Sequence, residues 1–145
     1  MSDRHLAEIA RTTLPGRASH VGDARRFVSG VLGGSWPRLD DVLVLTSELA
    51  SNAVKHSASG DGGQLAVIVA MCESGCCTRV QVDDQGGASE PRLHPSEDHE
   101  VTMTGGRGLR IVDVLADAWG VDGDELGRSV WFEITGNTEI AEFPT

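Results

Sequence analysis

Hydrophobic positions in the first half of the chain predict two amphipathic helices. In the first helix, apolar residues recur at steps of three and four residues, at Val21, Ala24, Val28, Val31 and Leu32. Ser19 is a candidate N-cap of this helix, and Gly33-Gly34 ends its pattern. A second helix is predicted over about residues 39–57, where Leu45, Leu49 and Ala53 form a stripe that can face a core.

The pattern then changes to one that is typical of β-strands. Residues 64–71 contain a continuous apolar run, which indicates a strand covered on both faces. Residues 78–82 alternate between apolar and polar, so two adjacent antiparallel strands are the simplest interpretation. Further strands are predicted at residues 119–121 and 129–134, and Leu6 to Thr12 could be an edge strand that Pro15-Gly16 ends.

Hydrophobic positions in residues 88–104 follow neither a helical nor a strand periodicity, and we expect a long loop or lid there. A helical stripe follows at Leu109, Val112, Leu115 and Ala116. This order of elements favours a two-layer α/β (α+β) sandwich, with a mixed, mostly antiparallel sheet and its helices on one face. The 145 residues suit one domain, 1–145.

Composition narrows the class of protein. The formal net charge of −10, without clustered basic residues, argues against direct nucleic-acid binding. No apolar run approaches the ~20 residues of a membrane-spanning helix, so we expect a cytoplasmic protein. Cys72, Cys76 and Cys77 fit no common zinc spacing, and apolar filling at strand ends is the favoured interpretation.

Candidate chemistry begins on the second helix. Glu48, Asn52 and His56 are spaced four and four, which places a carboxylate, an amide and an imidazole on one helix face. A solvated helix face would explain such a triplet if it stood alone. Two glycine-containing turns later in the chain favour a nucleotide site instead.

The first of these turns, Asp84-Gln85-Gly86, directly follows a predicted strand. The second, Gly105-Gly106-Arg107-Gly108, runs into the helix that begins near Leu109, and exposed amides at such a helix start can bind phosphate. Each turn is also compatible with a plain connection. The second is not a Walker A loop, because no Lys-Ser or Lys-Thr follows it.

In this order the three motifs resemble the GHKL ATPase superfamily, whose Bergerat fold occurs in gyrase, Hsp90, histidine kinases and MutL. The resemblance covers about residues 17–134 and is closest to the single-domain anti-sigma-factor serine kinases. It implies a histidine-kinase-like ATPase domain that uses ATP and Mg²⁺. It further implies that Glu48 is the general base or positions the nucleophile, that Asn52 coordinates Mg²⁺, and that His56 lies near the phosphates.

The same resemblance implies roles for the glycine turns. Asp84 would accept a hydrogen bond from the adenine amino group, and Gly86 would let the base lie against the backbone. Asp83 is the alternative for the adenine contact, although the spacing to Gly86 favours Asp84. The second glycine box, which would contact phosphate, comprises Gly105, Gly106, Arg107, Gly108 and Leu109. Ser129 resembles a hydroxyl residue that shares the adenine–aspartate water network.

The resemblance also implies partners. These are a STAS-domain anti-anti-sigma protein, phosphorylated on serine or threonine, and a competing sigma factor; a homodimer is possible. A catalytically silent ATP-binding regulatory module is the alternative, because Ala88 replaces the last glycine of the first glycine box. A structural module that binds no nucleotide would require all three motifs to be coincidental.

Overall fold

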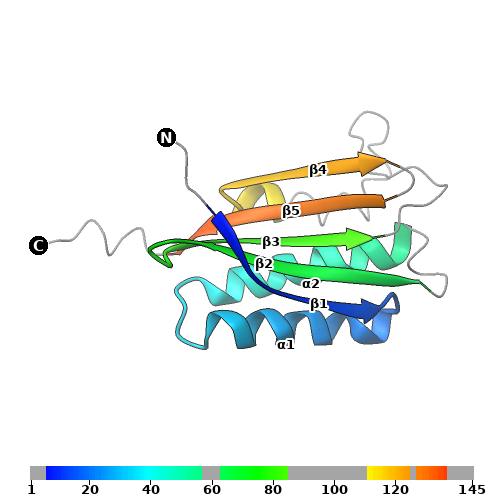
Figure 1. Ribbon diagram of the computed structural model, residues 1–145, viewed down its shortest axis with the longest axis horizontal. Coiled ribbons are helices and arrows are strands. Elements are labelled where there is room, and N and C mark those ends of the chain that lie inside the picture. The colour runs from blue at the N-terminus through cyan, green and yellow to red at the C-terminus, as the bar shows by residue number, and fades with distance from the viewer. Residues whose placement is uncertain (1–5, 57–62, 85–110, 125–126, 137–145) are drawn as a thin grey trace, which may run out of the picture.

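The computed structural model describes residues 6–56, 63–84, 111–124 and 127–136 (Figure 1). Its elements in chain order are β1 (Leu6–Pro15), a 3₁₀ turn (Ala18–His20), α1 (Val21–Leu32), α2 (Leu39–His56), β2 (Gln64–Cys72), β3 (Cys77–Asp84), β4 (Ala118–Asp124) and β5 (Gly127–Thr135). Residues 111–115 are also helical.

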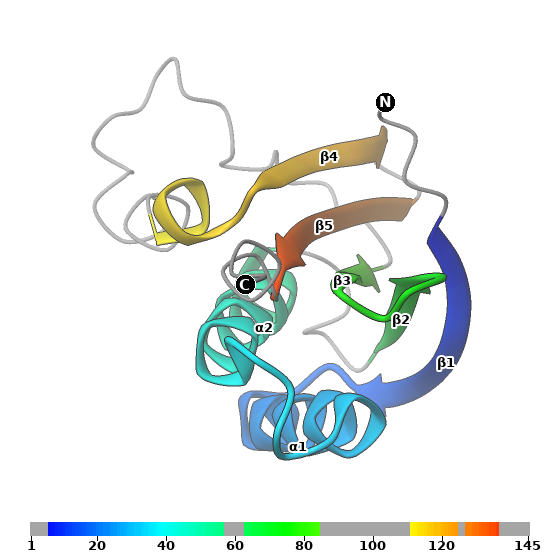
Figure 2. The ribbon, with the colours of Figure 1, turned by 90° about the vertical axis from the view of Figure 1, so that its left-hand side faces the viewer.

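The five strands form one sheet in the order β1-β2-β3-β5-β4. Each of the four neighbouring pairs among these described strands is antiparallel. The expected two-layer α+β sandwich is confirmed, and every strand pair within the described residues is antiparallel. Viewed toward one end of the molecule, α1 and α2 lie on the same side of the curved sheet (Figure 2).

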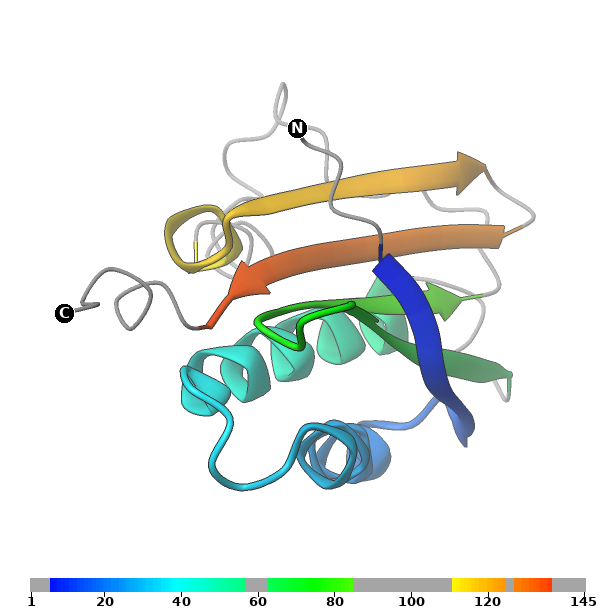
Figure 3. The same cartoon turned by 60° about the vertical axis from the view of Figure 1, so that its left-hand side comes forward.

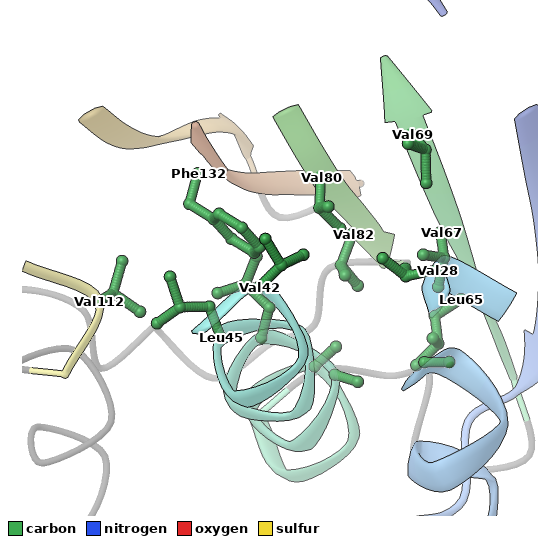
Figure 4. Close-up of a cluster of buried hydrophobic side chains, with 14 of the residues drawn as sticks. Val28, Val42, Leu45, Leu65, Val67, Val69, Val80, Val82, Val112 and Phe132 are labelled. Atoms are coloured by element: carbon green, nitrogen blue, oxygen red, sulfur yellow. The ribbon is translucent and has the colours of Figure 1, made fainter. Parts of the chain in front are cut away.

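The helices cover the sheet because each has one apolar face. In α1 this face includes Ala24 and Val28, which are fully buried. The apolar stripe of α2 packs on the same core, which also takes residues from β2, β3 and β5 (Figure 4). The buried core cluster comprises Ala24, Val28, Val42, Leu45, Leu49, Ala50, Ala53, Leu65, Val67, Val69, Val80, Val82, Val112, Phe132 and Ile134.

The predicted helix boundaries largely agree with the structure. α2 spans Leu39–His56, against the predicted 39–57. α1 ends where expected, at Gly33, whose φ of 95° lies in the left-handed region that favours glycine. Ser19 is not the N-cap of α1, because it lies inside the 3₁₀ turn and His20 is the capping residue.

The candidate edge strand is confirmed as β1, which pairs with β2 from Leu6 to Pro15 and contains an irregularity between Glu8 and Ala10. Both strands expected near the C-terminus are present, and each is longer than its apolar core suggested. No helix in the described part of the chain is long and apolar enough to cross a membrane.

Candidate functional site

The row of polar residues on α2 lies beside the helix's buried stripe. Leu45 and Leu49 are almost completely buried against the sheet, whereas Glu48 and Asn52 are half-buried. A carboxylate and an amide one helical turn apart therefore border the core without entering it. His56 is the last residue of α2, and its side chain lies outside the described residues.

Strand β3 places Asp84 on the side of the sheet that the helices cover. Successive side chains of a strand alternate between its two faces. Val80 and Val82 are buried in the core beneath the helices, so Asp84 continues their row. The end of α2 and the end of β3 lie at the same end of the molecule (Figures 1 and 3). Asp84 is half-buried there.

Asp83 points to the opposite face of the sheet. Its Oδ1 accepts a hydrogen bond of 2.5 Å from the Ser129 hydroxyl and one of 2.9 Å from the Gln81 amide. The strand register explains the first contact, because Asp83 and Ser129 are directly paired between β3 and β5. Ser129 thus contacts Asp83 rather than Asp84, and the side chains of Ser129 and Asp84 leave opposite faces of the sheet.

The residue paired with Asp84 on β5 is Arg128. Its side chain follows the buried row of Phe132 and Ile134, and it is itself only 7% exposed. Within the described residues, no hydrogen bond or ion pair of its guanidinium is found. Sequence reasoning missed Arg128, although counting back in steps of two from Ile134 and Phe132 would have placed it on the helix side.

A cation next to Asp84 changes the electrostatics of this end of the sheet. Burying a guanidinium is costly unless it has an anionic or hydrogen-bonding partner. A bound ligand that presents an acceptor atom beside Asp84 would supply a hydrogen-bonding partner. Arg128 is therefore a fourth candidate ligand-binding residue, beside Glu48, Asn52 and Asp84.

The glycine residues expected to bind the nucleotide lie outside the described residues, namely Gly86, Gly105, Gly106, Arg107, Gly108 and Leu109. The helical segment that follows them is described from residue 111. Its Val112 is fully buried in the core near Leu45 and Phe132 (Figure 4). This packing holds the helical residues 111–115, which follow the second glycine box in the chain, against α2 and β5.

The side-chain oxygens of Glu48 and Asn52 on α2 are of the kind that proteins use to bind Mg²⁺ at phosphate groups. That ion prefers oxygen ligands and binds through one or two protein side chains, water and substrate phosphates. The Asn52 amide and the Glu48 carboxylate supply such oxygens from a half-buried surface. Among the described residues, no group of three or more histidine, cysteine or acidic side chains could hold a metal ion.

Comparison with known families assigns the class of protein. Residues 14–134 match the model of the histidine kinase-like ATPase domain. This chain belongs to that family. The match begins at the end of β1 and ends in β5, so it includes both helices of the core and the whole polar end of the sheet.

Curated relatives are serine-protein kinases by name. The chain is 28% identical over 116 residues to the serine-protein kinase RsbW of Listeria monocytogenes serotype 4a, covering 72% of this chain and 73% of that protein. It is also 28% identical over 127 residues to the RsbW of Bacillus licheniformis, covering 79% of this chain and 78% of that protein. The RsbW of Halalkalibacterium halodurans is similar at 28% identity over 124 residues, with 78% and 75% covered.

Proposed function

We propose that this protein is an ATP-binding serine/threonine kinase of the anti-sigma-factor type. Membership of the histidine kinase-like ATPase family supports ATP as its ligand. The names of its relatives support protein serine as its phosphate acceptor. One structural observation supports the proposal: Asp84 lies on the helix side of the sheet where β3 ends, and α2, which carries Glu48 and Asn52, ends at the same end of the molecule (Figure 1).

The adenine end of the nucleotide would lie at the end of β3. The Asp84 carboxylate can accept a hydrogen bond from the adenine amino group, which gives base specificity. Asp83 does not offer this contact on the helix side, because its carboxylate is held by Ser129 and Gln81 on the other face. Arg128, buried beside Asp84, would be a neighbouring hydrogen-bond donor to the base.

The phosphates would lie near the polar row of α2. When bound there, Mg²⁺ would neutralise charge on the phosphate oxygens during phosphoryl transfer. Asn52 would hold the ion through its amide oxygen. Glu48 would accept the proton of the attacking serine or threonine hydroxyl as its oxygen bonds to the γ-phosphorus. The predicted roles of His56 and of both glycine boxes remain part of this proposal.

The protein acceptor would be a STAS-domain anti-anti-sigma protein, in competition with a sigma factor. A phosphoryl group adds about 1.5 to 2 negative charges at pH 7. This chain is itself acidic, with a net charge of −10, so the phosphorylated STAS protein would be repelled from it. The freed surface could then bind the sigma factor. A homodimer and a cytoplasmic location remain predictions.

Calorimetric titration of Mg-ATP into wild type and Asp84→Ala tests the nucleotide site. We expect saturable binding to wild type and its loss in the variant. Absence of binding to the folded wild-type protein would contradict ATP as the ligand. Circular dichroism of both proteins provides the control for folding.

Phosphate transfer is tested separately, with radiolabelled ATP and candidate STAS domains. Glu48→Gln keeps the size of the side chain but cannot accept the proton, so it should bind Mg-ATP and lose transfer. If wild type binds ATP yet phosphorylates no cognate STAS domain, the catalytically silent regulatory module becomes the better description. In that case Glu48→Ala would leave regulation intact.

A further inference from the structure

Three cysteines meet at the turn between β2 and β3. Cys72 ends β2, Cys77 begins β3, and Cys76 lies in the turn that joins them. The Sγ atoms of Cys72 and Cys76 are 3.9 Å apart. Cys72 and Cys76 are half-buried, so small solutes can reach them, whereas Cys77 is buried.

Hydrogen bonds converge on the sulfur of Cys72. The backbone N–H of Cys77 donates to this Sγ over 3.2 Å. The Ser74 hydroxyl lies 3.3 Å from it and donates to the Cys76 Sγ over 3.0 Å. Burial alone would raise the pKa of the Cys72 thiol. The contacts with Ser74, Cys77 and Cys76 outweigh burial and lower its pKa to about 6. The thiolate is the nucleophilic form of cysteine, and donors of this kind stabilise it.

The turn holds the two cysteines in place from both sides. The Trp36 indole N–H donates to the Gly75 carbonyl over 3.1 Å, and the Gly136 N–H donates to the Cys76 carbonyl over 2.7 Å. Gly75 has a φ of 81°, which allows the tight turn that returns Cys76 toward Cys72. A disulfide would require the two sulfurs to approach from 3.9 Å to about 2.05 Å.

We propose that Cys72 and Cys76 form a peroxide-reactive thiol pair, in which Cys72 is the attacking thiolate and Cys76 resolves the product as a disulfide. The oxidant is a hydroperoxide. The Cys72 sulfur bonds to one peroxide oxygen, the O–O bond breaks, and the second oxygen leaves as an alcohol or water after taking a proton. Cys72 is thereby oxidised to sulfenic acid and the peroxide is reduced.

In the second step the Cys76 sulfur attacks the sulfur of Cys72. The S–S bond forms, the S–O bond breaks, and the hydroxyl leaves as water with the proton of Cys76. The pair lies at the start of β3, whereas Asp84 lies at its end. This thiol site is therefore separate from the proposed nucleotide site, and its test does not depend on kinase activity.

Peptide mapping of the full-length chain tests the pair. The reduced protein is treated with a small excess of hydrogen peroxide at pH 7, its free thiols are blocked, and it is cleaved after Glu73. Cleavage there separates Cys72 from the other two cysteines, so a disulfide appears as two linked peptides. We expect a Cys72–Cys76 link, two hydrogens lighter than the reduced pair, with Cys77 carrying the blocking group.

Two variants complete the test. Cys76→Ser should lose the link and accumulate sulfenic acid on Cys72, trapped there by dimedone. Cys77→Ala is the matched control and should keep the Cys72–Cys76 link. A link between Cys72 and Cys77, dimedone mainly on Cys76 or Cys77, or unlinked wild-type protein after peroxide treatment would overturn the proposal.

Discussion

The two adjacent aspartates at the end of β3 allow a direct test of which face of the sheet binds nucleotide. Asp84 continues the buried row of Val80 and Val82, whereas Asp83 contacts Ser129 and lies on the other face. We predict that Asp84→Asn weakens Mg-ATP binding and that Asp83→Asn does not. Both changes preserve side-chain size and remove one negative charge, so each variant serves as the control for the other.

The two substitutions should change the affinity for Mg-ATP in opposite directions. Asn keeps an acceptor oxygen but loses the charge, and a hydrogen bond to a charged group contributes about 1–1.5 kcal/mol more than a neutral one, so Asp84→Asn should raise the dissociation constant about fivefold to tenfold. Removing a charge roughly 10 Å from an anionic ligand favours binding by about 0.4 kcal/mol in water before screening by salt. Asp83→Asn should therefore leave the affinity unchanged or raise it by less than about twofold.

Isothermal titration of Mg-ATP at two salt concentrations measures both effects. Ser129→Ala provides a further control, because it removes the hydrogen bond to Asp83 without changing charge, and it should leave the affinity unaltered. If Asp83→Asn weakens binding tenfold and Asp84→Asn does not, the assignment of faces is wrong. Equal weakening by both would mean that the strand end is distorted and that no single carboxylate binds the base.

Three further predictions concern stability. Phe132→Ala should lower the free energy of unfolding, measured in urea, by about 3–5 kcal/mol, because the ring is fully buried. The control Val114→Ala, at a site that is 78% exposed, should lower it by less than about 0.5 kcal/mol. Equal losses in the two variants would contradict the core assignment. Gly123→Ala should cost more than about 1 kcal/mol, because φ is 108° and a Cβ would clash with the Gly127 carbonyl oxygen; an unchanged urea midpoint would refute this reasoning. The pKa of Cys72 is lowered from 9.0 to about 6 in the folded protein, so its stabilising effect is present above pH 9 and is lost as pH falls toward 6. The difference in unfolding free energy between wild type and Cys72→Ser should therefore shrink over that range, and a difference that grows would contradict the direction of the shift.

The second helix was predictable almost to the residue because its pattern is strong and its ends are marked. The buried stripe of Leu45, Leu49 and Ala53 repeats every four residues, and the predicted end at residue 57 differs by one from the observed end at His56. The sequence signal of strand β1 is weaker, because an edge strand pairs on one side only and has little apolar alternation. It extends to Pro15, which can occupy an edge position since it needs no donor there.

The pairing of β3 with β5 could not be predicted from local pattern. More than forty residues separate the paired positions, for example Asp84 and Arg128, and helix-forming residues intervene. Without this register, the sequence does not show that Ser129 is paired with Asp83. The three consecutive apolar residues from Val130 to Phe132 also hid the alternation that assigns Arg128 to the helix side.

An apolar side chain on the face of the sheet away from the helices explains why the alternation of β5 was hidden. Trp131 points away from the core, and the guanidinium of Arg79 lies 4.2 Å from the centroid of its ring. Arg79 also forms an ion pair with Glu133 over 3.1 Å. An aromatic residue covered by a cation can remain on a polar face, because the ring is shielded and the charge stays near water. Hydrophobicity alone therefore misassigns the face of Trp131.

Along strands β3 and β5, buried apolar pairs give way to a charged pair at the strand end, and this makes the candidate site testable. The paired positions Val80 and Phe132 are fully buried, whereas Asp84 and Arg128 stand at the end of the same rows. The charged pair lies at the strand end, whereas the apolar pairs lie nearer the middle of the sheet. Because Asp84 neighbours the buried Arg128, the stability of each Asp84 variant is measured beside its affinity, whereas truncating Phe132 should act mainly on stability. A change in Mg-ATP binding can then be attributed to the site rather than to a general loss of folding.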